Sequence, residues 1–298
     1  MQRSLKYLPG RITALVVLLL VAAFACGGDD AHKVLFIGGI PDQDVSILES
    51  RFNSLAEYFS DATGLDVRYV PSVNYAAVVT GFRNNDIQMA WYGGLTGVQA
   101  RLAVPDAQAL AQRPRDAEFH SVFIARKSLG ITSLEQLKGR SFTFGSESST
   151  SGYLMPLHFL TEAGIDPDRD FSGFSFSGSH DTTWKLVEAG TVDAGALNAA
   201  VWEMRKADGR VDLDKVEVFW KTPAYFDYHW LARGDLDAEY GSGTIERLRD
   251  ALFGLNAANG GRQAEIMLAF QDERFVPSTN ENYDAIENVA RQLGIIEQ

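Results

Sequence analysis

Apolar and polar residues alternate with two different periods after residue 32, and these periods predict strands and helices in turn. The apolar run at 33–41 predicts a strand. In the stretch 44–64 apolar residues recur on one helical face, so we expect a helix that ends at Gly64. The residues of that face are Leu48, Phe52, Leu55 and Phe59.

The same alternation continues to about residue 103. Strands are predicted at 65–72 and 87–94, and helices at 75–86 and 95–103. Strands that alternate with helices of this length are typical of parallel strands covered by helices, so this part of the chain predicts an α/β unit.

A second alternating series begins after a strand at 120–127 and a short helix at 133–139. Its predicted strands are 140–146, 171–179 and 192–198, and its predicted helices are 149–164, 180–190 and 199–207. Strands at 215–223 and 228–234 and helices beyond residue 244 complete the chain.

We therefore expect an α/β protein of two lobes, each a mixed or parallel sheet flanked by helices, with the second lobe inserted into the first. The first lobe is predicted at 33–122 plus 225–298 and the second at 123–224. Strands near 121–126 and 216–231 are predicted at the two hinge crossings. Ligands of such sheets bind beyond the carboxyl ends of the strands, so we expect a ligand cleft between the lobes.

The N-terminal residues 1–25 predict a signal peptide. Three basic residues precede a 13-residue apolar stretch, which is too short to cross a bilayer. Cys26, the only cysteine, follows, and the sequence around it resembles a bacterial lipobox, in which the cysteine is acylated. Residues 26–32 then form a polar tether. The expectation is an exported, membrane-anchored lipoprotein; plain secretion with a free thiol is the alternative.

The net charge of −12 argues against nucleic acid as a partner, because phosphate backbones bind to basic surfaces. Loss of the three basic residues of the signal peptide takes the charge to −15. A small anion is compatible with this charge. Helix N-termini present unpaired N–H groups and a partial positive charge, so converging strand-to-helix turns bind anions without Lys or Arg. The four candidate turns are 38–44, 90–96, 145–152 and 177–182.

The turn at 145–152 is the richest in hydroxyl groups. Ser148, Ser149, Thr150 and Ser151 stand together before a glycine and an apolar run. Simple helix capping accounts for one such side chain. The alternative is a socket whose hydroxyl and amide groups surround an anion.

The runs 138–145 and 148–156 resemble the motif of the phosphonate-type periplasmic substrate-binding proteins of ABC transporters, which share the type II binding-protein fold with phosphite and phosphate relatives. The similarity continues in order along nearly all of the chain after the leader, through 74–94, 121–127, 177–198 and 275–286. Within the family, 113–125 and 192–202 look most like members labelled selenate-binding.

The resemblance implies a monomeric binding protein that captures a small tetrahedral oxyanion of the phosphonate, phosphite, phosphate or selenate class and delivers it to permease subunits. It implies no cofactor and no metal. In the family's pattern, a hydroxyl and amide cradle holds the oxyanion, two tyrosine hydroxyl groups of the first lobe bind it, and a histidine lies at a second-lobe turn. The matching residues are Ser149, Thr150 and Ser151 for the cradle, Tyr75 and Tyr92, and His180.

One departure from the family pattern bears on the ligand. Aminophosphonate binders hold the ammonium group with a carboxylate shortly after the strand that matches 192–198. Here Asn198 is followed by Ala199 and Ala200, and no acid appears before Glu203. We therefore expect an oxyanion without a cationic tail.

Two further residues near the predicted turns receive structural interpretations. Asp42 follows a proline at the first turn and is interpreted as a helix cap. Trp91, in the predicted strand 87–94, is interpreted as packing.

Three other functions stay open from sequence. A hydrolase would use Ser149 with His180 across the cleft, although no catalytic motif and no metal-ligand spacing of histidines appears. A second alternative is a binding protein for an organic ligand such as a sulfonate or a pyrimidine. The third is a lipoprotein that reports ligand to a receptor instead of a permease.

Overall fold

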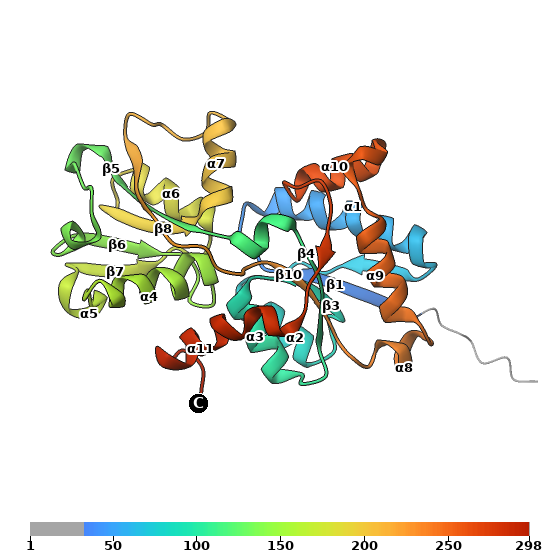
Figure 1. Cartoon of the computed structure of the whole chain (residues 1–298). Coiled ribbons are helices and arrows are strands. Elements are labelled where there is room, and N and C mark those ends of the chain that lie inside the picture. The colour runs from blue at the N-terminus through green and yellow to red at the C-terminus, as the bar shows by residue number, and fades with distance from the viewer. Residues whose placement is uncertain (1–32, 298) are drawn as a thin grey trace, which may run out of the picture. The chain divides into compact units, whose positions relative to one another are not determined.

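The structure is a computed structural model that describes residues 33–297, and Figure 1 shows its helices and strands. The predicted signal peptide (1–25), the tether (26–32) and Cys26 lie outside the described residues. Within the described part of the chain, no helix is both long enough and apolar enough to cross a membrane.

The first lobe is built on a six-stranded sheet in the order β11-β4-β10-β3-β1-β2. β1 is parallel to β2 and β3, whereas β10 runs antiparallel to β3 and β4. The strands are β1 (Val34–Gly39), β2 (Asp66–Tyr69), β3 (Met89–Tyr92), β4 (Gln108–Gln112), β10 (His229–Ala232) and β11 (Val276–Pro277).

Seven α-helices belong to this lobe in the described chain. They are α1 (Val45–Thr63), α2 (Tyr75–Arg83), α3 (Gly94–Ala103), α8 (Leu236–Tyr240), α9 (Thr244–Gly254), α10 (Gly261–Ala269) and α11 (Asp284–Gln292). α1 packs beside α9 and α10, and α11 packs against α3 (Figure 1). The predicted face of α1 is buried, and Gly64 ends the helix in the left-handed conformation that glycine adopts without strain. These two predictions are confirmed.

The second lobe is built on a five-stranded sheet in the order β7-β6-β8-β5-β9. β6 is parallel to β7 and β8, and β5 is antiparallel to β8 and β9. The strands are β5 (Ser121–Arg126), β6 (Ser141–Phe144), β7 (Gly173–Phe176), β8 (Ala194–Asn198) and β9 (Val216–Lys221), and the α-helices are α4 (Met155–Glu162), α5 (Pro167–Asp170), α6 (His180–Glu188) and α7 (Ala199–Ala207).

The chain passes twice between the two sheets. The connecting segments meet at an antiparallel bridge between Phe119 and Tyr225. The predicted boundary between residues 122 and 123 falls inside β5, all of which pairs within the second sheet. The segments that connect the sheets thus lie just before β5 and between β9 and β10.

The lobes share part of a hydrophobic core. Leu154 and Met155, at the start of α4, are buried in the apolar cluster that otherwise belongs to the first lobe. The second lobe has its own apolar clusters on the two faces of its sheet. The structure therefore records the two lobes in contact.

Two sequence expectations differ from the structure. No strand is predicted at β4, because its Gln-Ala-Leu-Ala-Gln sequence lacks the β-branched and aromatic residues that mark a strand. The helix predicted at 149–164 is divided into a π-helical turn (Thr150–Leu154) and α4.

Candidate functional site

The π-helical turn at the end of β6 presents three buried hydroxyl residues to the other lobe. Ser149 caps the turn, since its Oγ accepts the N–H of Gly152 at 2.9 Å. The N–H groups of Thr150 and Ser151 belong to the first turn and have no acceptor within the helix. We call Ser149, Thr150 and Ser151, with these N–H groups, the hydroxyl cradle. All three side chains are at most 2% exposed.

Two glycines shape the hydroxyl cradle. Because Pro156 has no N–H, the carbonyl of Gly152 is left without its helical donor and accepts the N–H of Gly145 at 2.7 Å. A Cβ on Gly152 would lie 3.0 Å from the Cα of Gly145 and 2.9 Å from Ser149 Oγ. The fold therefore requires glycine at position 152, next to the three hydroxyl residues.

The N-terminus of α3 in the first lobe closes on the hydroxyl cradle. Leu95 donates its N–H to Thr150 Oγ1 at 2.9 Å, and Gly94 donates its N–H to Asp227 Oδ1 at 2.9 Å. A Cβ on Gly93 would lie 3.0 Å from Asp227 Oδ1 and 3.1 Å from Thr150 Oγ1. Only glycine leaves room for this approach of the two lobes.

Asp227 lies in the segment between β9 and β10, and its carboxyl group is fully enclosed. Burial raises its pKa to about 7, while the Gly94 N–H and the hydroxyls of Thr150 and Ser151 act in the opposite direction. Near neutral pH the carboxyl group of Asp227 is thus protonated in part of the molecules and ionised in the rest.

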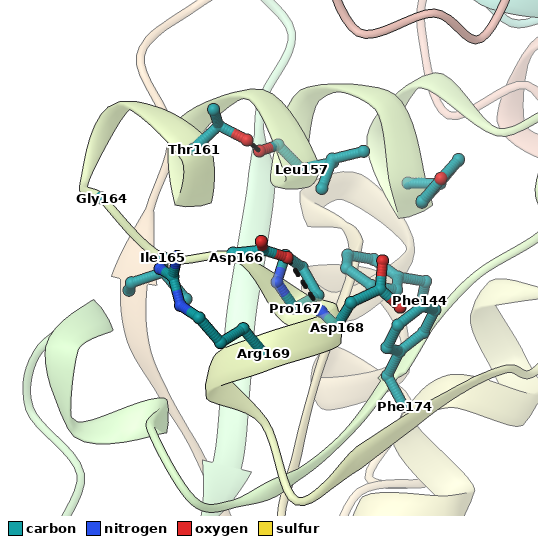
Figure 2. Close-up of a pocket in the computed structure, with 11 residues that line it drawn as sticks. Phe144, Leu157, Thr161, Gly164, Ile165, Asp166, Pro167, Asp168, Arg169 and Phe174 are labelled. Atoms are coloured by element: carbon teal, nitrogen blue, oxygen red, sulfur yellow. Dashed lines mark hydrogen bonds between the residues drawn. The ribbon is translucent and has the colours of Figure 1, made fainter.

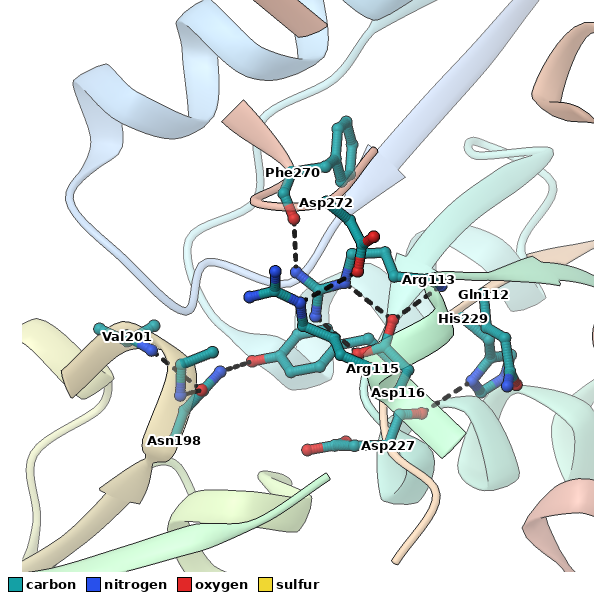
Figure 3. A network of polar contacts seen from close by, with 12 residues as sticks. Gln112, Arg113, Arg115, Asp116, Asn198, Val201, Asp227, His229, Phe270 and Asp272 are labelled. Carbon is teal, nitrogen blue, oxygen red and sulfur yellow. Dashed lines mark hydrogen bonds and ion pairs between the residues drawn. The ribbon is translucent and has the colours of Figure 1, made fainter. Parts of the chain in front are cut away.

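Tyr228 joins both lobes through its hydroxyl group. The hydroxyl donates to Asp42 Oδ2 at 2.8 Å and accepts from the side-chain amide of Asn198 at 3.0 Å. Figure 3 shows Asn198 reaching the tyrosine hydroxyl from the second lobe. The Asp42 carboxylate is 2% exposed. The interpretation of Asp42 as a helix cap is wrong, because Asp44 occupies the cap position of α1.

Three buried oxygen atoms face this region without a hydrogen-bond partner in the described structure. They are Asp42 Oδ1, the Tyr75 hydroxyl and Asp227 Oδ2. Burial raises the pKa of Tyr75 and of Tyr228, and the nearby charges of Asp42 and Asp227 raise it further, so the four side chains lie near one another. We call these four side chains the carboxylate wall. Ser149 lies close enough to lower the pKa of Tyr75, although no hydrogen bond joins the two residues.

The two predicted tyrosines have different surroundings. Tyr75 is 1% exposed and faces the hydroxyl cradle with a free hydroxyl. Tyr92 is buried inside the first lobe, where its hydroxyl donates to the carbonyl of Val78 at 3.2 Å and its ring packs against Phe82. The geometry thus brings the hydroxyl of Tyr75, but not that of Tyr92, to the hydroxyl cradle.

His180 begins α6 and links the two lobes through its backbone. Its N–H donates to the carbonyl of Asp42 at 3.0 Å, and its Nδ1 accepts the N–H of Asn198 at 3.4 Å. Burial lowers the pKa of His180, against the charges of Asp42 and Asp181, so the ring is neutral. Its Nε2 lies 3.4 Å from the Tyr228 hydroxyl.

The hydrolase alternative requires a hydrogen bond between Ser149 and His180. In the described residues Ser149 Oγ contacts the N–H of Gly152, and the two ring nitrogens of His180 contact Asn198 and Tyr228. The arrangement therefore lacks an activated serine.

A buried ion pair supports the carboxylate wall from behind. Arg113 donates through Nε and Nη2 to Asp116 at 2.8 and 2.6 Å (Figure 3). Its guanidinium lies 5.1 Å from the ring centroids of both Trp91 and Tyr228, which are stacked on each other. Trp91 is 1% exposed, so its interpretation as packing agrees with its position.

Open cavities lie elsewhere in the described chain. Figure 2 shows one of about 440 Å³ beside α4 and α5, bordered by aromatic rings and by the carboxyl groups of Asp166 and Asp168. Another, of about 620 Å³, lies between 114–120 and α7. Neither cavity is lined by the hydroxyl and N–H donors of the hydroxyl cradle, so the region between the cradle and the carboxylate wall is the better candidate for an anion.

Sequence reasoning missed Asp227 and Tyr228 and misjudged Asp42. Asp42 lies three residues after the end of β1, within the predicted turn 38–44, which is a recognisable signal for a ligand group. Asp227 lies in the connecting segment before β10 and Tyr228 begins the strand predicted at 228–234, and neither stands at a predicted strand-to-helix turn. Their approach to Asp42 and Asn198 depends on how the lobes close.

The family model described as "ABC transporter, phosphonate, periplasmic substrate-binding protein" matches residues 37–283. The probable ABC transporter phosphite binding protein PhnD1 of Prochlorococcus marinus (strain MIT 9301) is 42% identical over 286 residues, 93% of this chain and 96% of the relative. The phosphate-import protein PhnD of Mycolicibacterium smegmatis is 24% identical over 313 residues, 95% of this chain and 96% of the relative.

The structure of PhnD1 from Prochlorococcus marinus in complex with methylphosphonate superposes with a TM-score of 0.85 at 43% identity. The match covers 89% of this chain and 99% of that chain. The likeness confirms the two-lobed type II binding-protein fold. It also assigns the chain to binding and not to catalysis, since the relatives are substrate-binding components of transporters. The chain belongs to the family of phosphonate-type periplasmic substrate-binding proteins of ABC transporters.

Proposed function

We propose that this protein captures a small tetrahedral phosphorus oxyanion between its lobes and delivers it to the permease subunits of an ABC transporter. The observation that carries the proposal is the set of three unpartnered buried oxygens, on Asp42, Tyr75 and Asp227, near the hydroxyl cradle. Buried polar atoms are nearly always hydrogen-bonded, so an unpaired set of this kind indicates a place for a polar ligand.

The hydroxyl cradle supplies donors of the kind that a dense oxyanion requires. The N–H groups of Thr150 and Ser151 stand at a helix N-terminus, and the hydroxyl of Ser151 lies beside Asp227. Charge-assisted hydrogen bonds to such donors are about twice as strong as neutral ones. The net charge of the chain does not oppose binding, because its field is screened over about 8 Å at physiological ionic strength.

The carboxylate wall favours anions that keep a proton. Asp227, with a pKa near 7, shares one proton with a bound oxyanion: it donates when protonated and accepts from a ligand hydroxyl when ionised. Phosphite, phosphate and phosphonates titrate near neutral pH, as phosphate monoesters do with a second pKa of about 6. Sulfate and selenate have no proton to share at neutral pH. We therefore propose phosphorus oxyanions ahead of the selenate class.

The second lobe offers no anchor for a cationic tail. Ala199 and Ala200 follow Asn198, and the Glu203 side chain is 60% exposed and paired with Lys206. An aminoalkylphosphonate would thus find no carboxylate of the second lobe for its ammonium group. PhnD1 is named as a phosphite binding protein and its structure contains methylphosphonate, which supports a small ligand of this class.

The proposed site consists of the hydroxyl cradle, the carboxylate wall, His180 and Asn198. Tyr92 is assigned to it as a support beneath Tyr75 and not as a ligand contact. We also propose a monomer with lobes at about 33–120 plus 223–298 and 121–222, and export followed by acylation at Cys26. Periplasmic location follows from the family, and the acyl anchor remains the proposal of the sequence around Cys26.

A thermal-unfolding panel tests the ligand class. Purified protein that lacks residues 1–26 is heated with methylphosphonate, phosphite, phosphate, sulfate, selenate and 2-aminoethylphosphonate. At about 100 times Kd a ligand adds roughly 2.7 kcal/mol, which corresponds to an increase of about 5–10 °C in Tm. We expect that increase for the first three anions only.

The Ser149→Ala variant is the matched site variant for this panel, and Ser148→Ala, one residue outside the hydroxyl cradle, is its control. The increase in Tm should disappear in the first variant and persist in the second. An equal response to selenate and phosphite, or a response that survives Ser149→Ala, contradicts the proposal.

A further inference from the structure

The two lobes make a second set of contacts beside the anion site. The loop that carries Gln43 and Asp44 in the first lobe lies against α6 and α7 of the second lobe. The Asp44 N–H donates to Asp181 Oδ2 at 3.0 Å, and Arg205 Nη2 donates to Gln43 Oε1 at 3.3 Å. None of these groups belongs to the hydroxyl cradle or the carboxylate wall.

The inner half of this contact is a buried ion pair. Arg205 donates from Nε and Nη2 to the two oxygens of Asp181, both at 2.7 Å, and the side chains are 2% and 1% exposed. Burial alone would raise the pKa of Asp181, but the hydrogen bonds of Arg205 and Trp184 hold it at about 2. The pair therefore stays charged and presents a fixed surface to Gln43 and Asp44.

The outer half is a pair of solvent-exposed ionic contacts to one carboxylate. Asp44 lies 3.1 Å from Lys185 Nζ and 3.5 Å from Arg210 Nη2. The three side chains are between 34% and 45% exposed, so these contacts are sensitive to salt. Both cations belong to the second lobe and the carboxylate to the first.

The position of these contacts connects them to ligand binding. Asp44 is two residues from Asp42 of the carboxylate wall, and Asp181 follows His180, whose N–H donates to the Asp42 carbonyl. Each side of the contact is thus rigidly joined to one side of the anion site. Whatever holds Asp44 against α6 also holds Asp42 against His180.

We propose that Gln43, Asp44, Asp181, Lys185, Arg205 and Arg210 form a lobe-to-lobe latch that sets ligand affinity by stabilising the closed arrangement. They act as positioning residues, without touching the anion. The apparent affinity of a ligand that needs the closed form falls in proportion to the fraction of protein that is closed. The latch raises that fraction, and its outer half makes the affinity depend on ionic strength.

The inference rests on the proposed function for its ligand readout, so the experiment includes a readout without ligand. Lys185→Glu, Asp44→Lys and the double variant are titrated with methylphosphonate by calorimetry, and their radii of gyration are measured by X-ray scattering with and without ligand. We expect each single variant to bind roughly five- to thirtyfold more weakly, because a cross-lobe attraction becomes a repulsion. The double variant restores an opposite-charge pair and should return to within roughly fivefold of the parent protein.

Lys215→Glu is the matched control. It makes the same change of charge in the second lobe, where Lys215 pairs only with Asp212 of that lobe. Its affinity should stay within about twofold of the parent protein, since surface substitutions away from such contacts have small effects. The unfolding temperature of each ligand-free variant is measured as well. If the double variant regains affinity while these temperatures stay the same, the weaker binding of the single variants comes from the latch and not from a loss of fold.

Single variants that bind like the parent protein, or a double variant as weak as the two singles combined, overturn the latch. If the parent protein binds none of the oxyanions, the proposed function fails. The radii of gyration of the ligand-free proteins still test the latch. In that case the ligand-free single variants should be more extended than the parent protein and the double variant should not; equal radii overturn the proposal.

Discussion

The two walls of the anion site differ in charge and in the way the chain builds them. The hydroxyl cradle is a run of three consecutive residues, Ser149–Ser151, that offers hydrogen-bond donors at a helix N-terminus. The carboxylate wall gathers Asp42, Tyr75 and the adjacent residues Asp227 and Tyr228 from three separate parts of the chain, and it offers acids.

The comparison teaches how the site divides its tasks. Donors on the hydroxyl cradle supply attraction for an oxyanion, and this attraction alone would not distinguish sulfate from phosphate. The acid on the other wall, Asp227, decides whether the anion must bring a proton. Four changes test this division, in order of expected effect.

The largest effect should follow from damage to the hydroxyl cradle. In Ser149→Ala with Thr150→Ala, the two hydroxyls that order the turn and meet Leu95 are lost. Charge-assisted hydrogen bonds contribute roughly 1.5–3 kcal/mol each, so we expect a loss of roughly 3–6 kcal/mol in the binding of methylphosphonate. Calorimetric titration measures it, with Ser148→Ala as the control; a Kd that changes less than tenfold would contradict the role of the hydroxyl cradle.

A methyl group at the meeting point of the two walls should have the next largest effect. The Cβ of Gly93→Ala would press on Asp227 Oδ1 and Thr150 Oγ1, one from each wall. Overpacking of this kind costs roughly 1–3 kcal/mol, and the part that falls on Thr150 should appear in ligand affinity, because that contact joins the two lobes.

Gly81→Ala, within α2 of the same lobe, is the control for this change. Its Cβ would lie 3.1 Å from the side chain of Ile87 and 3.9 Å from the Cβ of Asp86, and it would touch neither wall of the site, so affinity should not change. Equal affinities for the two variants, measured by titration, would show that the Gly93 position does not limit closure.

Replacement of Asp227 should alter selectivity more than affinity. In Asp227→Asn the preference for phosphite over sulfate should fall by roughly tenfold or more, because the group that accepts a ligand proton is gone. Competition titrations between pH 5.5 and pH 9 measure the ratio. The parent protein should lose phosphite affinity as pH rises above about 7, whereas the variant should show a flatter profile. If the variant prefers phosphite over sulfate as strongly as the parent protein does, another group is responsible for the selectivity.

The raised pKa of Asp227 also predicts that the stability of the ligand-free protein depends on pH. Its pKa in the folded state, about 7, exceeds the ordinary value of 3.8, so the native state binds this proton more tightly than the unfolded state does. Its stabilising contribution is therefore complete below about pH 4 and is lost as pH rises to about 7. Asp227→Asn should remove this fall, which chemical denaturation at a series of pH values would show.

The smallest effects should separate the two tyrosines. Tyr75→Phe removes an unpartnered buried hydroxyl, so the ligand-free protein should gain up to about 1 kcal/mol in stability and lose affinity by about the same amount. Tyr92→Phe removes the hydrogen bond to Val78, so stability should fall by about 1 kcal/mol without a change in affinity. Denaturation and titration of both variants check this, and the reverse pattern would restore Tyr92 as a ligand contact.

Much of the fold was predictable from the sequence because its signals are local. The face of α1 and its end at Gly64, the alternation of strands with helices, and the two lobes all follow from the periodicity of apolar residues. β4 escaped prediction because Gln-Ala-Leu-Ala-Gln carries no strand signal of its own and is ordered by its neighbours β10 and β11.

The candidate site also has one part that local sequence signals predict and one part that they do not. The sequence by itself determined the hydroxyl cradle, since a helix N-terminus, its cap and its glycine lie within eight residues. It also determined the family, because similar motifs recur in order along the chain.

Only the tertiary structure decided the carboxylate wall and the latch. Asp42, Asp227 and Tyr228 meet because the sheet edges and the connecting segments bring them together, and the pKa of Asp227 rises because closure removes water. The tertiary structure also decided the role of Tyr92, because the carbonyl of Val78 in α2 lies within hydrogen-bond distance of its hydroxyl. The contact between Asp42 and Tyr228 joins residues more than a hundred positions apart, and no local pattern of residues encodes it.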